Sequence, residues 1–382
     1  MISVAEVAGK KDLREFIDLP YRLYRSDPLW VAPIRSTQRD LFDRSGGHPF
    51  HEHSEVAHFL ARDRIGVVVG RITATINHRH NEYHRDRIGF FGFLEAARDQ
   101  RVFDALFDRA SEWLRSKGME AIRGPLNYST NEESGLLVEG FDSSPMLMMP
   151  YNPPYYAEGI EAAGFSKAKD LLAYRLEAEG LKWDRMRKVA ALVSRRTGTE
   201  IRDIRKDRLY EEVLILMDVY NECWNRNWGF VPMTDAEFRQ MAKDLGMLLE
   251  PALAPMIFKG DAAVAFAVAL PDANQALLKA RGSLLGALVA LKAPVLRTRI
   301  DRFRVLLLGV REKWRGCGLE SLLIARLVEN GIRLGYRWAE LSWVLEDNTA
   351  RRRILEREMD AMPYKTYRVY EKSLRAPCGS VG

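Results

Sequence analysis

Apolar and polar residues in the first half of the chain follow the pattern of a mixed α/β fold. β-Branched residues are concentrated at 65–77, next to an apolar run at 56–61, and the two runs predict a strand hairpin. Apolar residues recur at helical spacing through 102–117 and stop before Gly118, which predicts a helix. The other elements predicted in this half are strands at 89–94, 121–123 and 168–176 and a helix at 155–163.

The second half repeats this order of elements. A hairpin at 256–259 and 262–270 is followed by a strand at 303–310 and an amphipathic helix at 319–334. Thr234 and Glu237 have the spacing of a capping box at a helix start. The remaining predicted elements are helices at 209–225, 235–249, 273–280, 284–293 and 349–358 and strands at 338–345 and 364–372.

The restart of the pattern near residue 181 predicts two domains, 1–180 and 181–382. Each is expected to hold a mixed, mostly antiparallel sheet flanked by helices, so the predicted fold class is α/β (α+β). The length of 382 residues suits two domains rather than one. The hydrophobic fraction of 47% and charged fraction of 29% are typical of a folded protein.

Charge and cysteine content exclude several classes of function. The net charge is +6, but no dense Lys/Arg tract marks a nucleic-acid-binding arm, so nucleic acid is not an expected partner. Cys223, Cys317 and Cys378 form no CxxC pair, so neither a disulfide framework nor a metal site is predicted. The first residues lack the apolar core of a signal peptide, and the apolar stretch 283–296 is too short to cross a bilayer. A cytoplasmic location in a bacterial cell is therefore expected.

One turn in the second half carries the clearest chemistry. The strand that ends at Val310 leads through Arg315, Gly316 and Gly318 directly into the helix that begins near Leu319. Unpaired N–H groups and the helix dipole at such a start attract phosphate, and glycines let a ligand approach the backbone. Positive charge is added by Arg311, Lys313 and Arg315. The alternative is a glycine-rich turn that only reverses the chain.

This turn resembles the acyl-CoA signature of the GNAT superfamily of N-acyltransferases, Arg/Gln-x-x-Gly-x-Gly/Ala after a strand. Glu320 departs from the signature, because a small residue usually stands there. The resemblance implies acetyl-CoA or another acyl-CoA as the donor, with thioester contacts from backbone N–H groups at the strand end and pantetheine contacts from an Asn before the following helix. The implied donor-binding residues are Gly309, Val310, Arg315, Gly316, Cys317, Gly318, Leu319 and Asn348.

The first half resembles a degenerate copy of the same domain. Residues 152–165 are similar to the later GNAT helix that ends in Gly-Phe, but 95–101 contain no glycine, so a phosphate cradle is not predicted there. Tandem GNAT proteins such as the mycothiol synthases offer a precedent, in which one copy binds the acyl-CoA and the other shapes the substrate groove. The resemblance thus implies that the first half forms a groove wall.

The acceptor site and the catalytic groups are less well specified by the sequence. Asn127, Asn131 and Glu132 precede a Met-rich run, and this mix suits an amine or lipid-like acceptor. Trp228 is a candidate for the opposite wall of the groove. As alternatives, the 127–150 segment is a long insertion packed on its own domain, and Trp228 is a core residue. Glu340 is the candidate general base or a solvated strand residue, and Tyr367 is the candidate acid or strand surface.

The function predicted from these features is acyl-CoA-dependent N-acyl transfer to an unidentified amine, by direct attack on the thioester. One alternative is a Fem-like transferase that uses an aminoacyl-tRNA donor, which a tandem GNAT layout permits. Another is a non-catalytic acyl-CoA-binding module, which the departure at Glu320 suggests. The apolar helices between 273 and 296 indicate a long-chain acyl donor or peripheral contact with a membrane.

Overall fold

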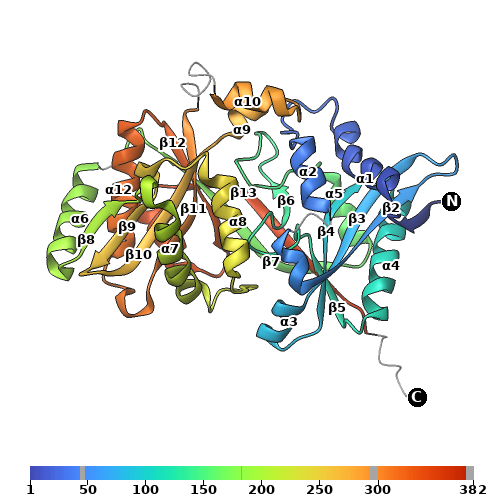
Figure 1. The fold of residues 1–382 in the computed structure, drawn as a ribbon, viewed down its shortest axis with the longest axis horizontal. Helices are drawn as coiled ribbons and strands as arrows, with labels where there is room; N and C mark the ends of the chain where they lie inside the picture. The colour runs from blue at the N-terminus through green and yellow to red at the C-terminus, as the bar shows by residue number, and fades with distance from the viewer. Residues whose placement is uncertain (44–47, 182, 293–299, 376–382) are drawn as a thin grey trace. The chain divides into compact units, whose positions relative to one another are not determined.

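The computed structural model describes residues 1–43, 48–181, 183–292 and 300–375, which form two compact units (Figure 1). The first unit comprises Met1–Leu171, Arg281–Leu284 and the C-terminal segment from Lys365 on, and the second comprises Leu172–Ala280 and Leu285–Tyr364. The last strand of the chain therefore begins in the second unit and ends in the first. Cys378 and residues 293–296 of the apolar stretch lie outside the described residues.

The sheet of the first unit is mostly antiparallel. The strands β1 (Ser3–Glu6), β2 (Ser54–Arg62), β3 (Val68–Asn77) and β4 (Ile88–Ala96) pair antiparallel in that order. β4 then pairs in parallel with β5 (Ala121–Gly124). The C-terminal strand β13 (Met362–Ser373) runs antiparallel to β5 and to β6 (Leu136–Glu139).

The helices of the first unit cover this sheet. Phe103, Leu106 and Phe107 on α4 (Gln100–Ser116) are fully buried against Ile72 and Phe91 of the sheet, so the stripe that predicted this helix forms the core. The sequence pattern did not predict α1 (Lys10–Leu23), α2 (Arg35–Phe42) or α3 (His78–His84). The remaining elements are α5 (Tyr155–Ala162), a 3₁₀ turn at Pro49–His53 and β7 (Ser166–Glu177), which continues into the second unit.

The second unit repeats the strand pattern of the first. Its strands β8 (Glu200–Asp203), β9 (Pro255–Lys259), β10 (Ala262–Pro271) and β11 (Arg302–Val310) pair antiparallel in chain order. β11 then pairs in parallel with β12 (Trp338–Leu345). Four antiparallel strands followed by a parallel pair thus occur twice, which confirms the repeat and the mixed, mostly antiparallel class predicted from the sequence.

Every helix predicted in the second half of the chain has a counterpart among the described residues. The predicted capping box is present at α8 (Asp235–Gly246), where Thr234 and Glu237 exchange hydrogen bonds. The helix predicted at 349–358 is α13 (Thr349–Arg353) continued by a π-helical turn, Ile354–Glu358. The other helices are α6 (Trp183–Thr197), α7 (Leu209–Trp224), α9 (Asn274–Leu277), α10 (Leu284–Lys292) and α12 (Leu319–Arg333), with 3₁₀ turns at Lys206–Arg208, Pro251–Leu253 and Glu312–Trp314.

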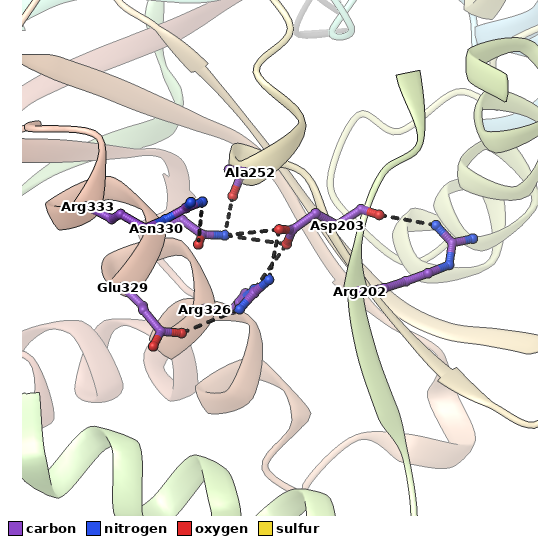
Figure 2. A network of polar contacts seen from close by, with 7 residues as sticks. All are labelled: Arg202, Asp203, Ala252, Arg326, Glu329, Asn330 and Arg333. Carbon is purple, nitrogen blue, oxygen red and sulfur yellow. Dashed lines mark hydrogen bonds and ion pairs between the residues drawn. The ribbon is translucent and has the colours of Figure 1, made fainter. Parts of the chain in front are cut away.

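A polar network fixes α12 against the strands of its unit. Figure 2 shows Asp203 of β8 accepting two hydrogen bonds from Arg326, at 3.0 and 2.8 Å. The buried Asn330 donates from Nδ2 to the carbonyl oxygen of Ala252 at 2.7 Å. Because both side chains leave the same helix, the network holds the orientation of α12, and with it the position of the helix N-terminus.

Candidate active site

The turn between β11 and α12 presents an open helix start. Gly316 and Gly318 have φ angles of 75° and 89°, a left-handed conformation that glycine adopts without strain. In this part of the described structure no side chain caps the first turn of α12. The N–H groups of that turn have no partner within the helix, so an anion at the turn would receive hydrogen bonds and the positive end of the helix dipole.

The two glycines of the turn serve different purposes. A Cβ placed at Gly318 would lie 2.9 Å from Cγ2 of Val193 on α6, so this glycine lets α6 pack against the turn. A Cβ at Gly316 would meet no described atom within 4 Å. Gly316 therefore faces open space, and it marks the side from which a ligand can approach the backbone.

Several arginines lie near this turn, but the charge of one of them is neutralised by carboxylates. Arg311 contacts the carboxylates of Asp218 and Glu222 on α7, so its expected contribution to the charge of the turn is offset. Arg315 donates to the carbonyl oxygen of Cys223 at 2.9 Å.

Arg196, an exposed residue of α6 that was not predicted to belong to the site, donates to the carbonyl oxygen of Cys317 at 2.9 Å. Trp183, Met186, Ala190 and Val193 of this helix recur at helical spacing and pack on the core of the second unit. That stripe was the available signal for α6 and thus for its basic C-terminal turn.

The parallel ladder next to the turn is short. It pairs Arg302–Val305 with Trp338–Leu341, although β11 continues to Val310 and β12 to Leu345. Beyond the ladder, Arg351 of α13 donates from Nη1 to the carbonyl oxygen of Leu308 at 3.3 Å.

Desolvation lowers the pKa of Arg351, while the charge of Glu320 opposes that shift. Glu320 departs from the GNAT signature because it carries a carboxylate where a small residue is usual. The structure therefore places a countercharge within electrostatic reach of that carboxylate.

The corresponding place in the first unit is filled by the chain itself. The ladder of β4 and β5 ends at Phe90 and Arg123, and the next carbonyl, of Phe91, accepts from the N–H of Leu126 at 2.8 Å. The N–H of Phe93 donates to Oδ1 of Asn127 at 2.7 Å.

At the start of α4, Asp99 accepts from the N–H of Arg101 at 3.0 Å. A carboxylate thus occupies the helix end where a phosphate would need to bind.

As predicted, Gly309 lies at the end of β11 and Asn348 directly before α13, and both have a structural role. A Cβ at Gly309 would lie 2.5 Å from Cζ3 of Trp224, so only glycine allows this tryptophan of α7 to pack on the end of β11. Asn348 caps α13 by accepting from the N–H of Arg351 at 3.1 Å. The predicted contacts of Gly309, Val310 and Asn348 with the donor stay predictions.

Glu340, the candidate base, lies in a buried polar network of the second unit. Its side chain is fully buried, so the alternative of a solvated strand residue is wrong. It accepts from Oγ of Ser342 at 2.6 Å and from the hydroxyl of Tyr364. Nε of the buried Arg304 lies 3.5 Å from the same carboxylate. Two groups that can exchange protons, a carboxylate and a phenol, are thus in direct contact.

Tyr367 and the acceptor candidates of the first half belong to the first unit. Tyr367 is fully buried on β13 opposite Leu137, and its role as an acid stays a prediction. Oδ1 of Asn127 accepts a hydrogen bond from the N–H of Phe93, and its Nδ2 donates one to Glu133 at 2.9 Å. Oε1 of Glu132 lies 3.9 Å from Nε2 of His48.

Other acceptor candidates are at least partly buried. Asn131 lies in the same turn as Glu132, where its N–H donates to Oγ of Ser129 at 3.2 Å. Met146 and Met149 are buried in the first unit, which favours packing over an open groove for these two residues. Trp228 is half-buried in the segment between α7 and α8 of the second unit.

Among the described residues there is neither a metal-binding group nor a helix that could span a membrane. Within the ranges that the structure describes, no group of three or more His, Cys, Asp or Glu side chains has a metal-binding arrangement. Among the described helices, none combines the length and the apolar character needed to span a membrane.

Comparison with known proteins shows relatives along the whole chain. No protein-family model matches it. The chain is 38% identical over 376 residues to protein YghO of Escherichia coli (strain K12), covering 96% of this chain and 94% of YghO. It is 36% identical over 385 residues to bacterial ceramide synthase of Caulobacter vibrioides (strain NA1000 / CB15N), covering 98% of both chains.

Solved structures share the fold at low sequence identity. A tandem GNAT protein from the clavulanic acid biosynthesis pathway superposes with a TM-score of 0.57 at 12% identity, covering 99% of this chain and 100% of that one. A GCN5-related N-acetyltransferase from Sphaerobacter thermophilus gives 0.53 at 13% identity, covering 98% and 96%. The likeness therefore extends over both units, in agreement with the repeated order of elements.

Proposed function

Because the chain belongs to the GNAT superfamily, and within it to the family of YghO and bacterial ceramide synthase, we propose that it is an acyl-CoA-dependent N-acyltransferase. Its donor is a CoA thioester and its acceptor is a long-chain amine. The observation that carries the proposal is the uncapped start of α12, where Gly316 faces open space.

The donor assignment is supported by the fit of CoA chemistry to the second unit. CoA carries phosphate groups, which suit the N–H groups of the first helical turn and the guanidinium of Arg196 beside it. Its pantetheine arm is extended and contains amides, so it can pair with a strand edge in the way that an added strand does. β11 offers such an edge beyond its ladder with β12. At the corresponding positions of the first unit that the structure describes, Asp99 caps the start of α4 and Leu126 and Asn127 bond the edge of β4, so we assign the donor to the second unit.

In the proposed reaction the acceptor nitrogen attacks the thioester carbon, the C–S bond breaks and CoA leaves as the thiolate. The amine must lose a proton, and the contact of Tyr364 with Glu340 provides a route for it. The half-buried Tyr364 takes the proton on its hydroxyl oxygen while its own proton passes to Glu340. Arg304, whose Nε lies 3.5 Å from the carboxylate, holds Glu340 in position throughout.

The proposed class of acceptor is taken from the name of one relative. Ceramide is an amide of a fatty acid and a long-chain amino alcohol, so the name of the Caulobacter protein implies a fatty acyl donor and a lipid amine as acceptor. The identity of 36% extends over 98% of both chains, which supports a shared reaction class. The name of YghO does not specify a substrate.

Two assays on the purified full-length chain test the proposal. Thermal shift and calorimetry with CoA thioesters of increasing acyl length measure donor binding, and mass spectrometry of mixtures with a long-chain 2-amino-1,3-diol or a short diamine detects the amide. We expect tight binding of long-chain thioesters and an amide of the long-chain amine, with release of free CoA. Binding to tRNA without binding to CoA would favour an aminoacyl-tRNA donor. CoA binding without turnover of either amine would favour a binding module.

A further inference from the structure

Over Leu284–Ala290, the part of α10 whose side chains are described, the large apolar side chains lie on the outside of the protein. Leu285 is 73% exposed, Leu288 is 38% exposed and Val289 is 56% exposed. The small side chains of Ala287 and Ala290 are buried instead, at 1% and 5%. The helix is therefore seated on the protein by its small residues, and its bulky residues point away from it.

This arrangement is the reverse of the usual one. Burial of a large apolar side chain contributes about 1.5–3 kcal/mol, far more than burial of Ala, so a helix that only completes a core turns its Leu and Val inward. Leu285, Leu288 and Val289 have the spacing of one helical face, and Leu284 extends the exposed apolar surface by one residue. A contiguous apolar patch of this kind marks a surface that another apolar body covers.

We propose that this face of α10 docks onto the surface of an anionic lipid bilayer, with the helix parallel to the membrane plane. Lys279 and Arg281 are exposed and precede the helix in the chain, and the whole chain carries a net charge of +6. Apolar side chains flanked by basic ones match the acyl boundary and the anionic headgroups of such a surface. The described part of the helix, Leu284–Lys292, has nine residues, too few to cross the bilayer.

The same charges argue against a second copy of this chain as the occupant. Two copies related by a two-fold axis would meet through the same patch, and this arrangement would bring Lys279 and Arg281 toward their own counterparts. A bilayer offers negative charge beside an apolar layer instead. The proposal rests on exposure and charge, independently of the catalytic assignment. If the proposed function holds as well, α10 would bring the enzyme to a membrane that contains its lipid substrates.

Vesicle co-sedimentation of the full-length chain tests the docking surface. The vesicles contain phosphatidylcholine mixed with phosphatidylglycerol, or phosphatidylcholine alone, and no substrate is added. We expect binding to the mixed vesicles, weakened at least about tenfold by the double substitution Leu285→Glu and Val289→Glu. Leu192→Glu is the matched control, because Leu192 is 66% exposed on another helix, α6, and the substitution is chemically the same. The control should bind like the wild type.

Each other outcome decides against the proposal. Unchanged vesicle binding by the α10 double variant, with circular dichroism showing a wild-type fold, would show that α10 does not contact the membrane. A dimer seen by analytical ultracentrifugation that the same variant abolishes would make a second copy the occupant. Equal binding to neutral and to anionic vesicles would show that headgroup charge does not contribute to vesicle binding. Since no reaction is measured, these results are separable from any failure of the catalytic proposal.

Discussion

Arg351 of α13 donates a hydrogen bond to the carbonyl oxygen of Leu308, on the part of β11 that has left its ladder with β12. In the first unit the corresponding strand edge is bonded by Leu126 and Asn127, which belong to the segment directly after β5. A single side chain can rotate away from an edge, whereas a backbone segment must refold to leave it. The edge of β11 proposed to bind the donor can therefore open, and its counterpart in the first unit cannot.

Glu320→Gln should strengthen CoA binding. Glu320 lies in the first turn of α12, where its negative charge opposes that of a bound diphosphate, and Arg351 offsets only part of this repulsion. We expect the Kd for CoA to fall about three- to tenfold at low ionic strength, and less at high ionic strength because salt screens the interaction. Calorimetry at two salt concentrations measures the change.

Glu329→Gln on the same helix is the control for Glu320→Gln. Its carboxylate is exposed and lies 3.5 Å from Arg326, in the network of Figure 2, so the affinity should stay at the wild-type value. Equal Kd values for Glu320→Gln and the wild type would place the diphosphate elsewhere.

Gly316→Asp should abolish most of the CoA affinity with little effect on the core. The new side chain would enter the open space beside the helix start and bring a negative charge there. We expect the Kd to rise at least about tenfold, equivalent to about 1.4 kcal/mol.

Gly335→Asp is matched to Gly316→Asp in backbone strain. The φ angles of Gly316 and Gly335 are 75° and 84°, and a Cβ at Gly335 also meets no described atom within 4 Å. The two variants should lose similar stability, measured by urea unfolding, and only the first should lose affinity. A similar loss of CoA affinity in both variants would show that the loss results from a destabilised fold and not from a blocked binding site.

Gly318→Ala should destabilise the second unit more than Gly316→Ala. Both substitutions strain a left-handed residue by about 1 kcal/mol. Only the first drives a methyl group against Val193, and this crowding should cost about 1–3 kcal/mol more. Unfolding in urea measures both. Val193→Ala, combined with Gly318→Ala, should recover part of the loss, and an additive double variant would argue against direct contact.

Several of the elements predicted from the sequence have apolar patterns whose burial in the fold matches the prediction. α4 and α12 have apolar stripes that fill the cores of their units, and β11 ends in an uncharged, mostly apolar run from Val305 to Val310, so local sequence and tertiary burial agree. α1 has Pro20 inside it, which by itself predicts a helix end, yet packing of Phe16 and Leu19 into the core keeps the residues helical. Tertiary contacts overrode the local signal there.

The polar contacts of the candidate site could be predicted only in part. The Gly316 turn is a local feature and was found from the sequence, whereas Arg196 reaches the same turn from a helix far away in the chain. Tyr364, on β13, is the tyrosine in contact with Glu340 of β12, and no role was predicted for it from the sequence. This contact joins two strands through side-chain packing, which the local sequence pattern does not specify.

Stability of the first unit should fall as the pH is lowered, because of His80. Burial lowers the pKa of His80 to about 3, and the charges of His84 and Arg123 add to the shift. The unfolded chain keeps the ordinary value near 6.5, so it takes up this proton first. The contribution of His80 is complete above pH 6.5 and declines between about 6.5 and 3, by up to about 1.4 kcal/mol per pH unit.

Urea unfolding at pH 7 and pH 5 checks this sign. The wild type should lose stability between the two values, and His80→Gln should lose less because its side chain cannot take up a proton. His78→Gln is the control, since His78 is exposed on the same helix, and its pH dependence should match the wild type. A variant at His80 with the wild-type slope would assign the pH dependence to other groups.

Glu340→Gln should reduce both stability and turnover. The substitution keeps the shape of the side chain but leaves Arg304 buried beside a neutral amide, and breaking a buried pair costs about 3–5 kcal/mol. If Glu340 also receives the proton of the amine, kcat should fall about 10²- to 10⁴-fold at temperatures where the variant is folded. Asp203→Asn is the control, because it breaks the network of Figure 2 in the same unit without contacting Glu340.

Tyr364→Phe separates the two tasks of Glu340, because it removes the phenol and preserves the pair with Arg304. A proton relay requires that phenol, so kcat of this variant should fall while KM for the thioester and the unfolding free energy change little. A purely structural Glu340 predicts the opposite: Tyr364→Phe would keep the wild-type kcat, and so would Glu340→Gln wherever it is folded.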